Sequence, residues 1–127
     1  MTMKKIIETE KAPKAIGPYS QANEKNNTVY VSGQLPINPQ TGTIESDDIS
    51  EQTRQSLENA RAVLAAADAS FDDVVKVTVL LDDIQDFAQM NTVYGTFFTS
   101  NYPARAAYEV AKLPLGAKVE IEMIAEK

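Results

Sequence analysis

Residues 48–81 read DISEQTRQSLENARAVLAAADASFDDVVKVTVLL, and their pattern changes halfway along. Apolar residues first recur at helical spacing, which predicts a helix over 49–67. Asp48 is its expected N-cap, and Glu51, three residues on, completes a capping box. Residues 74–81 then alternate in the manner of a strand, with Val75, Val77, Val79 and Leu81 on one face. A helix next to a strand that it can cover indicates an α+β fold.

The remaining elements extend this pattern in both directions. A second helix is predicted to start near residue 83 and to end before Pro103, with an apolar stripe formed by Ile84, Phe87, Met90, Tyr94 and Phe97. Further strands are predicted over 28–34, 105–110 and 118–125, and a weaker N-terminal hairpin over 6–9 and 19–23. The last two strands are joined by the turn at 113–116 and are expected to pair. The result is a mixed β-sheet with two helices packed on one face.

Length and composition indicate one soluble domain spanning residues 1–127. The chain has 43% hydrophobic and 24% charged residues, which is ordinary for a globular protein. No apolar stretch approaches the ~18 residues of a membrane span. The first eleven residues lack the apolar core of a signal peptide. We therefore expect a cytoplasmic protein with no membrane partner.

Two missing residue types restrict the possible chemistry. The chain has no Cys and no His, which excludes thiolate nucleophiles, Ser-His-Asp triads and imidazole or thiolate metal sites. Dispersed glycines exclude a phosphate-binding loop. We therefore expect no cofactor and no metal. The net charge of −6 disfavours nucleic acid as a partner, because it repels phosphate backbones.

The predicted faces of the last two strands place charged residues on one side of the sheet. If the more apolar faces meet the helices, Arg105 and Glu120 both project from the side without helices. That side also carries Leu80 and Ile124. It is too apolar for a plain solvent surface, so the sequence favours an oligomer that buries it.

Arg105 is the only arginine predicted to lie on a strand, since Arg54 and Arg61 belong to the first helix. Its planar guanidinium suits two-point binding of a carboxylate. The alternative is a structural ion pair with Glu109, Glu120 or Glu122. Glu120 is either a surface carboxylate or a base that positions water beside the arginine.

Four other positions are weaker candidates on pattern alone. Tyr19 follows Gly-Pro and is equally explained by packing, and Ser32-Gly33 ends a strand where a bulge is the plain alternative. Asn91 lies in the second helix, one position off the apolar stripe, where a surface amide is common. None of them identifies a substrate.

Several motifs, in order along the chain, resemble the reactive intermediate deaminase family (Rid, or YjgF-like). They are GPYSQA at 17–22, VSGQLP at 31–36, PQTG at 39–42, Asn91-x-x-Tyr94, PAR at 103–105, EVAKLP at 109–114 and VEIE at 119–122. The resemblance covers essentially the whole chain. It implies a chorismate-mutase-like fold and a homotrimer with clefts between subunits.

The implied activity is cofactor-free hydrolysis of 2-imino acids, the products of pyridoxal-phosphate enzymes such as threonine dehydratase, to 2-keto acids and ammonia. By position, Arg105 would bind the substrate carboxylate and Glu120 would hold the attacking water. The cleft would be lined by Tyr19, Ser32, Gly33, Asn91 and the backbone at Ala107. Many relatives carry cysteine at the last position, which a backbone contact tolerates.

Two other function classes remain open at this point. A trimeric regulatory protein could sense 2-keto acids through the same cleft, which would need Arg105 but not Glu120. A ribonuclease or translation inhibitor, also associated with relatives, is disfavoured by the acidic charge and the absence of His.

Overall fold

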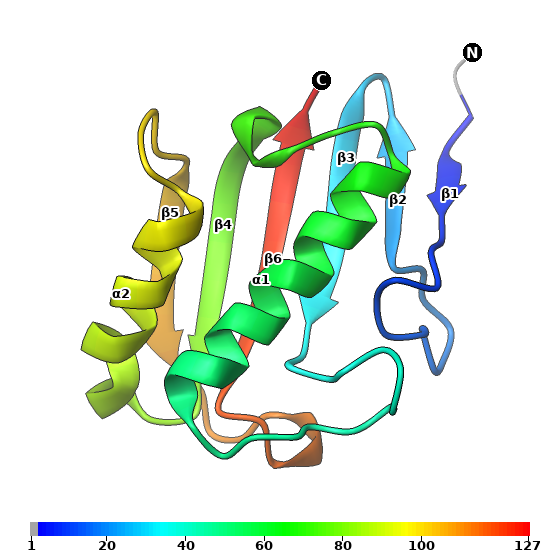
Figure 1. The fold of residues 1–127 in the computed structure, drawn as a ribbon. Coiled ribbons are helices and arrows are strands. Elements are labelled where there is room, and N and C mark those ends of the chain that lie inside the picture. The colour runs from blue at the N-terminus through cyan, green and yellow to red at the C-terminus, as the bar shows by residue number, and fades with distance from the viewer. Residues whose placement is uncertain (1–2) are drawn as a thin grey trace.

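The computed structural model describes residues 3–127 and shows a six-stranded mixed sheet with two helices on one face (Figure 1). This confirms the predicted fold class. The sheet order is β1-β2-β3-β6-β4-β5. The elements are β1 (Lys5–Ile7), β2 (Ala22–Lys25), β3 (Thr28–Gln34), α1 (Ile49–Ala66), β4 (Val74–Leu81), α2 (Phe87–Phe97), β5 (Ala104–Glu109) and β6 (Val119–Glu126), with single 3₁₀ turns at 71–73, 84–86 and 114–116. Residues 1 and 2 of the predicted domain lie outside the described part.

The start of α1 confirms the predicted N-cap but not the full capping box. The Asp48 carboxylate accepts a hydrogen bond from the Glu51 backbone N–H at 3.0 Å. The Asp48 N–H donates to Ser46 Oγ at 3.0 Å instead of reaching the Glu51 side chain. The preceding loop thus supplies the second capping contact, a partner that the helical pattern could not reveal.

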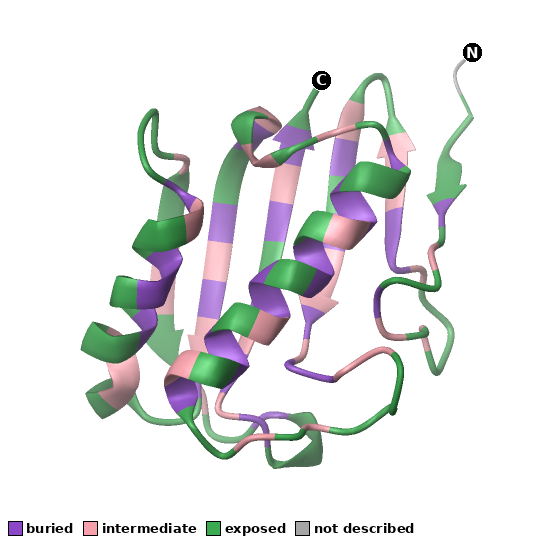
Figure 2. Ribbon diagram, viewed as in Figure 1, coloured by how far each residue is buried: buried purple, intermediate pink, exposed green. Residues whose placement is uncertain are grey.

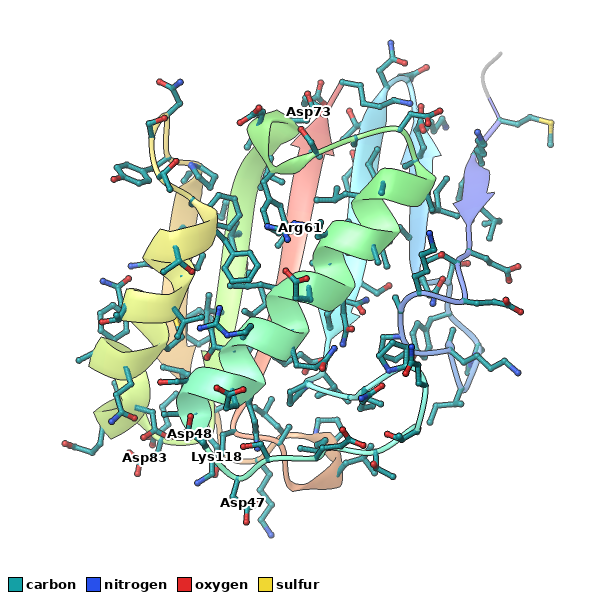
Figure 3. The ribbon with its side chains drawn as sticks, in the orientation of Figure 1. Asp47, Asp48, Arg61, Asp73, Asp83 and Lys118 are labelled. Carbon is teal, nitrogen blue, oxygen red and sulfur yellow. The ribbon has the colours of Figure 1, made fainter. Side chains whose placement is uncertain are left out.

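The core lies between the sheet and the two helices. Alternate residues of the central strands, among them Val77, Val79 and Ile121, are fully buried beneath Leu57 and Leu64 of α1 (Figure 2). The exposed side chain of Arg61 in α1 reaches toward α2, and its guanidinium lies 4.9 Å from the ring centre of Phe97 (Figure 3). The two helices thus also contact each other above the sheet.

The expected pairing of the last two strands is wrong. β6 lies between β3 and β4 and is antiparallel to both, while β5 pairs with β4 in parallel at the edge. The chain reaches β5 from β4 through α2, and such a βαβ crossover makes the two strands parallel. The turn at 113–116 is therefore not a hairpin turn but leads β6 back into the centre, where Val119 and Ile121 are fully buried.

A bulge also corrects one predicted face. The register of β4 against β6 shifts between Val74 and Lys76, so Val75 is an extra residue. Val74 and Val77 are buried, whereas the side chain of Val75 is 47% exposed. Strict alternation along the strand had placed Val75 with the core residues.

No helix of the described chain covers the opposite face of the sheet. The strand residues on that face include large apolar side chains, since Tyr30 is 47% and Tyr108 is 51% exposed. Ile6 is exposed as well, and Leu80 and Ile124 are only half-buried. We refer to this surface as the open face.

Asp48 offers a test of the α1 cap. Replacing an N-cap aspartate by alanine typically costs about 1 kcal/mol, so we expect Asp48→Ala to lower the free energy of unfolding by about that amount in urea titrations. Asp47→Ala is the matched control, because Asp47 is an equally exposed neighbouring carboxylate outside the cap. Equal losses in both variants would show that charge, and not the cap, is responsible.

Candidate functional site

Arg105 lies on the helix side of the sheet, which contradicts the prediction that it projects from the open face. In the parallel register of β4 and β5, Arg105 is paired with Val77, and Val77 is buried beneath the helices. Paired residues in neighbouring strands point to the same side. The prediction failed because β5 is an edge strand, where the apolar-inward rule is weakest and a long polar side chain can reach solvent past α2.

Three residues of α2 hold the Arg105 guanidinium. Its Nη1 donates to Asn91 Oδ1 at 2.7 Å. Its central carbon lies 4.6 Å from the ring centre of Tyr94 and 5.5 Å from that of Phe87. Phe87, Asn91 and Tyr94 follow the i, i+4, i+7 spacing of one helix face. Sequence reasoning proposed Asn91 but missed the two aromatic residues, which that spacing could have identified.

Arg105 has no carboxylate partner within residues 3–127. The ion pairs of this part of the chain join Arg61 to Glu58 and Lys127 to Glu24. Glu109, one of the three expected partners, instead accepts a hydrogen bond from the Ile84 N–H at 2.9 Å. The structural ion pair considered for Arg105 is therefore absent from the single chain, and most of its five N–H donors remain available to a ligand.

We call Arg105, its three α2 contacts and Ala107 the arginine half-site. Ala107 is two residues beyond Arg105 on the same side of β5 and is half-buried against the core. Tyr94 is buried, and this raises the pKa of its hydroxyl, although the positive charge of Arg105 opposes the shift. Tyr94 in turn stacks on Phe98 with ring centres 4.7 Å apart. The guanidinium is thus oriented by a packed aromatic support.

Glu120 lies on the open face, as predicted, and is half-buried. It is paired with Leu80 in the antiparallel register of β6 and β4. Partial burial raises the pKa of its carboxyl, and the nearby Glu122 charge raises it further. A carboxylate with a raised pKa and no ion-pair partner among the described residues is suited to accepting a proton from water.

Of the other predicted residues, Gly33 lies against Glu120, Ser32 precedes Gly33 in β3, and Tyr19 belongs to the loop that Ser32 contacts. The Glu120 carboxylate lies directly over Gly33. The Ser32 hydroxyl donates to the Ser20 carbonyl at 2.6 Å, so its proton serves the fold. Tyr19, 52% exposed, precedes Ser20 in the loop that Ser32 anchors. We call Tyr19, Ser32, Gly33 and Glu120 the carboxylate half-site.

The two half-sites lie on opposite sides of one sheet. β4 separates the strands that carry Arg105 and Glu120, and the two side chains point to opposite faces of that sheet. A small molecule cannot touch both side chains of the same chain, because the sheet lies between them. The residues that the sequence proposed as one site are therefore brought together in two groups.

Neither half-site resembles a metal centre. Residues 3–127 contain no group of three or more Asp, Glu, His or Cys side chains that could hold a metal ion. None of the helices in this range is both long and apolar enough to cross a membrane. The available groups are a guanidinium, a carboxylate, hydroxyls and backbone amides, which can bind an anion and activate water.

Nearly the whole chain is similar to known proteins. The family described as Endoribonuclease L-PSP matches residues 9–127. A RutC family protein from Pyrococcus horikoshii is 54% identical over 98% of this chain and 99% of its own. The human 2-iminobutanoate/2-iminopropanoate deaminase is 49% identical over 97% of this chain and 90% of its own. The chain belongs to the Rid (YjgF-like) family.

Solved Rid family structures agree with the fold throughout. A crystal structure of E. coli TdcF with bound serine superposes with a TM-score of 0.93, 48% identity and coverage of 97% of this chain and 98% of TdcF. A Thermotoga maritima protein named as a putative endoribonuclease gives a TM-score of 0.96 at 49% identity, with 98% of each chain covered. The crossover that places β5 at the edge is therefore a feature of the family fold.

The raised pKa of Glu120 has a measurable consequence for the stability of this Rid protein. The folded state favours the protonated form of Glu120 over the charged form. The contribution of the protonated form to the free energy of unfolding is fully present below the ordinary glutamate pKa, and it is lost as the pH rises through the folded-state pKa. At protein concentrations low enough for the subunits to be dissociated, we expect Glu120→Gln to be more stable than the parent at pH 7 and equally stable near pH 3.5. Urea titrations at both pH values measure this. A variant that is less stable at pH 7 would contradict the cause given for the shift.

Proposed function

We propose that this protein hydrolyses 2-imino acids to 2-keto acids and ammonia, in a cleft built from the arginine half-site of one subunit and the carboxylate half-site of another. The observation that carries the proposal is the unpaired, preoriented Arg105 guanidinium, with a proton-accepting Glu120 on the opposite face. Relatives about half identical over nearly the whole chain bear the name 2-iminobutanoate/2-iminopropanoate deaminase.

The chemistry needs orientation and a positioned water, but no nucleophilic side chain. Water adds to the electrophilic C=N carbon while Glu120 takes up its proton. Glu120 passes this proton to the imine nitrogen, which gives a carbinolamine. The carbinolamine hydroxyl then gives up its proton, the nitrogen takes up a proton as the C–N bond breaks, and the carbonyl forms as ammonia leaves. Arg105 holds the substrate carboxylate through two parallel N–H donors, which fixes the imine carbon relative to the water. Tyr19, Gly33, Asn91 and the backbone at Ala107 line the proposed cleft.

The open face supports assembly into the homotrimer that the proposal requires. It carries exposed Ile6, Tyr30 and Tyr108 around a centre that no helix covers. A ring of subunits with head-to-tail contacts places each arginine half-site against a neighbour's carboxylate half-site. Arg105 then meets the opposite charge that it lacks within its own chain.

Direct assay of the reaction tests the proposal. The purified protein is added to a threonine dehydratase reaction, and the release of 2-ketobutyrate is timed while semicarbazide traps surviving imine. We expect faster 2-ketobutyrate release, less trapped product and no loss of activity in EDTA. If the amount of imine trapped by semicarbazide stays the same even when this protein is in molar excess over the dehydratase, the proposed activity is overturned.

A second candidate function is a sensor that binds small amino or keto acids without turnover. The structure of TdcF contains bound serine, so a relative holds an amino acid. Glu120→Gln separates the two candidates, because a sensor needs the Arg105 contact and a hydrolase also needs the carboxylate. A ribonuclease, suggested by the family description, fits poorly with a net charge of −6 and no His.

Arg105→Ala is expected to abolish both imine hydrolysis and 2-ketobutyrate binding. A hydrogen bond to a charged group contributes about 1.5–3 kcal/mol, so binding should weaken at least tenfold. Arg105→Lys should fail as well, because an ammonium group cannot make the planar two-point contact. The control is Arg54→Ala, an exposed arginine of α1. A folded, correctly assembled Arg105→Ala protein with normal turnover would refute the proposed role.

Mixing two inactive variants tests whether the cleft forms between subunits. Arg105→Ala and Glu120→Gln chains are unfolded together, refolded together and compared with each variant treated alone. With random assortment in a cyclic trimer, roughly a quarter of the clefts receive both intact residues, so roughly a quarter of the parent turnover should return. Light scattering should give the mass of three chains. If the mixed trimers recover no activity, the two residues do not act together across a subunit boundary, and the proposed cleft between subunits is wrong.

A further inference from the structure

Gly33 occupies a position in β3 where a side chain would collide with Glu120. A Cβ built on Gly33 would come within 2.8 Å of Glu120 Cδ and within 3.1 Å of its Cγ, and closer still to Oε2. These atoms are not backbone but the carboxylate end that the proposed reaction uses. The missing side chain therefore leaves the space that the carboxylate fills.

The backbone around Gly33 explains how the carboxylate comes so close. Between Val31, paired with Met123, and Gln34, paired with Ile121, β3 has two residues where β6 has only one. This is a β-bulge, which turns the local strand and leaves an extra residue unpaired. Ser32 fixes the bulge through two hydrogen bonds, one from its hydroxyl to Ser20 and one from its N–H to the Gln21 carbonyl.

A need for an unusual backbone conformation does not explain why residue 33 is a glycine. The backbone φ of Gly33 lies outside the left-handed region, whereas Gly17, Gly42 and Gly116 all have positive φ. An alanine could adopt the Gly33 backbone conformation without strain. The contact with Glu120 is the constraint that the surrounding atoms impose.

We propose that Gly33 is a positioning residue: the bulge and its missing side chain form a seat that holds the Glu120 carboxylate against the backbone of β3. The seat keeps the carboxylate half-buried and away from cations of its own chain. Its consequence for turnover rests on the proposed function, in which this carboxylate activates water. Partial burial of the seated group also accounts for its raised pKa.

Gly33→Ala tests the seat, with Gly95→Ala as the matched control. A Cβ on Gly95, an exposed residue of α2, meets no atom within 4 Å. We expect Gly33→Ala to reduce kcat by about 10- to 100-fold, because displacement of a reacting group by about 1 Å can have an effect of that size. KM should change little, since Arg105 still binds the substrate. Gly95→Ala should keep the parent kcat.

A double-mutant cycle with Glu120→Ala shows whether Gly33 acts through the carboxylate. Glu120→Ala removes the colliding atoms, so adding Gly33→Ala should cause no further loss of turnover or thermal stability. An equal further loss in the Glu120→Ala background would overturn the proposal. In that case Gly33 would act on substrate or fold independently of Glu120.

Titration of Glu120 by carbon-13 NMR provides a readout that does not depend on activity. In Gly33→Ala the displaced carboxylate gains solvent, and its pKa should move toward the ordinary glutamate value. An unchanged pKa would overturn the seat. If the parent protein shows no deaminase activity at all, the proposed function fails, while this titration still decides whether Gly33 holds the carboxylate.

Discussion

The crossover from β4 through α2 to β5 determines on which side of the sheet Arg105 lies and which residues support it. It makes β5 parallel to β4, places β5 at the edge of the sheet and sets the register that pairs Arg105 with Val77. The same helix that forms the crossover supplies Phe87, Asn91 and Tyr94 to the guanidinium. One connection thus fixes both the direction and the support of the arginine.

Uncompensated charge follows from this arrangement. Arg105 has no carboxylate within the described chain, and Glu120 has no cation, because the sheet separates them. Arg105 is exposed at the edge of the sheet and is held there by its contacts with α2, whereas Glu120 is half-buried over Gly33. In the proposed function, a neighbouring subunit and the carboxylate of the substrate supply the missing partners.

Sequence patterns predicted most of the fold but not the side on which Arg105 lies. The bounds 28–34 and 74–81 are confirmed, and the periodicity of residues 49–67 gives α1 to within one residue. The predicted pairing of β5 with β6 is wrong because neighbours in sequence need not be neighbours in a sheet, and the connection through α2 makes β5 a parallel neighbour of β4. Val75 was misplaced because a bulge leaves no trace in strict alternation. The quoted motifs contain the residues of both half-sites, whereas local spacing could not show that the sheet separates them.

The position of Glu120 shows why such a site is costly to maintain in a single chain. Its burial opposes ionisation, so the charged form that is ready to accept a proton is also the form that destabilises the fold near neutral pH. Proximity of a guanidinium from a second chain would relieve that cost by favouring the carboxylate. Assembly and ionisation of Glu120 are then linked: the pH at which the carboxylate becomes charged should also be the pH range in which association strengthens. Burial of the open face by a neighbouring subunit and ionisation of Glu120 therefore contribute to the same association equilibrium.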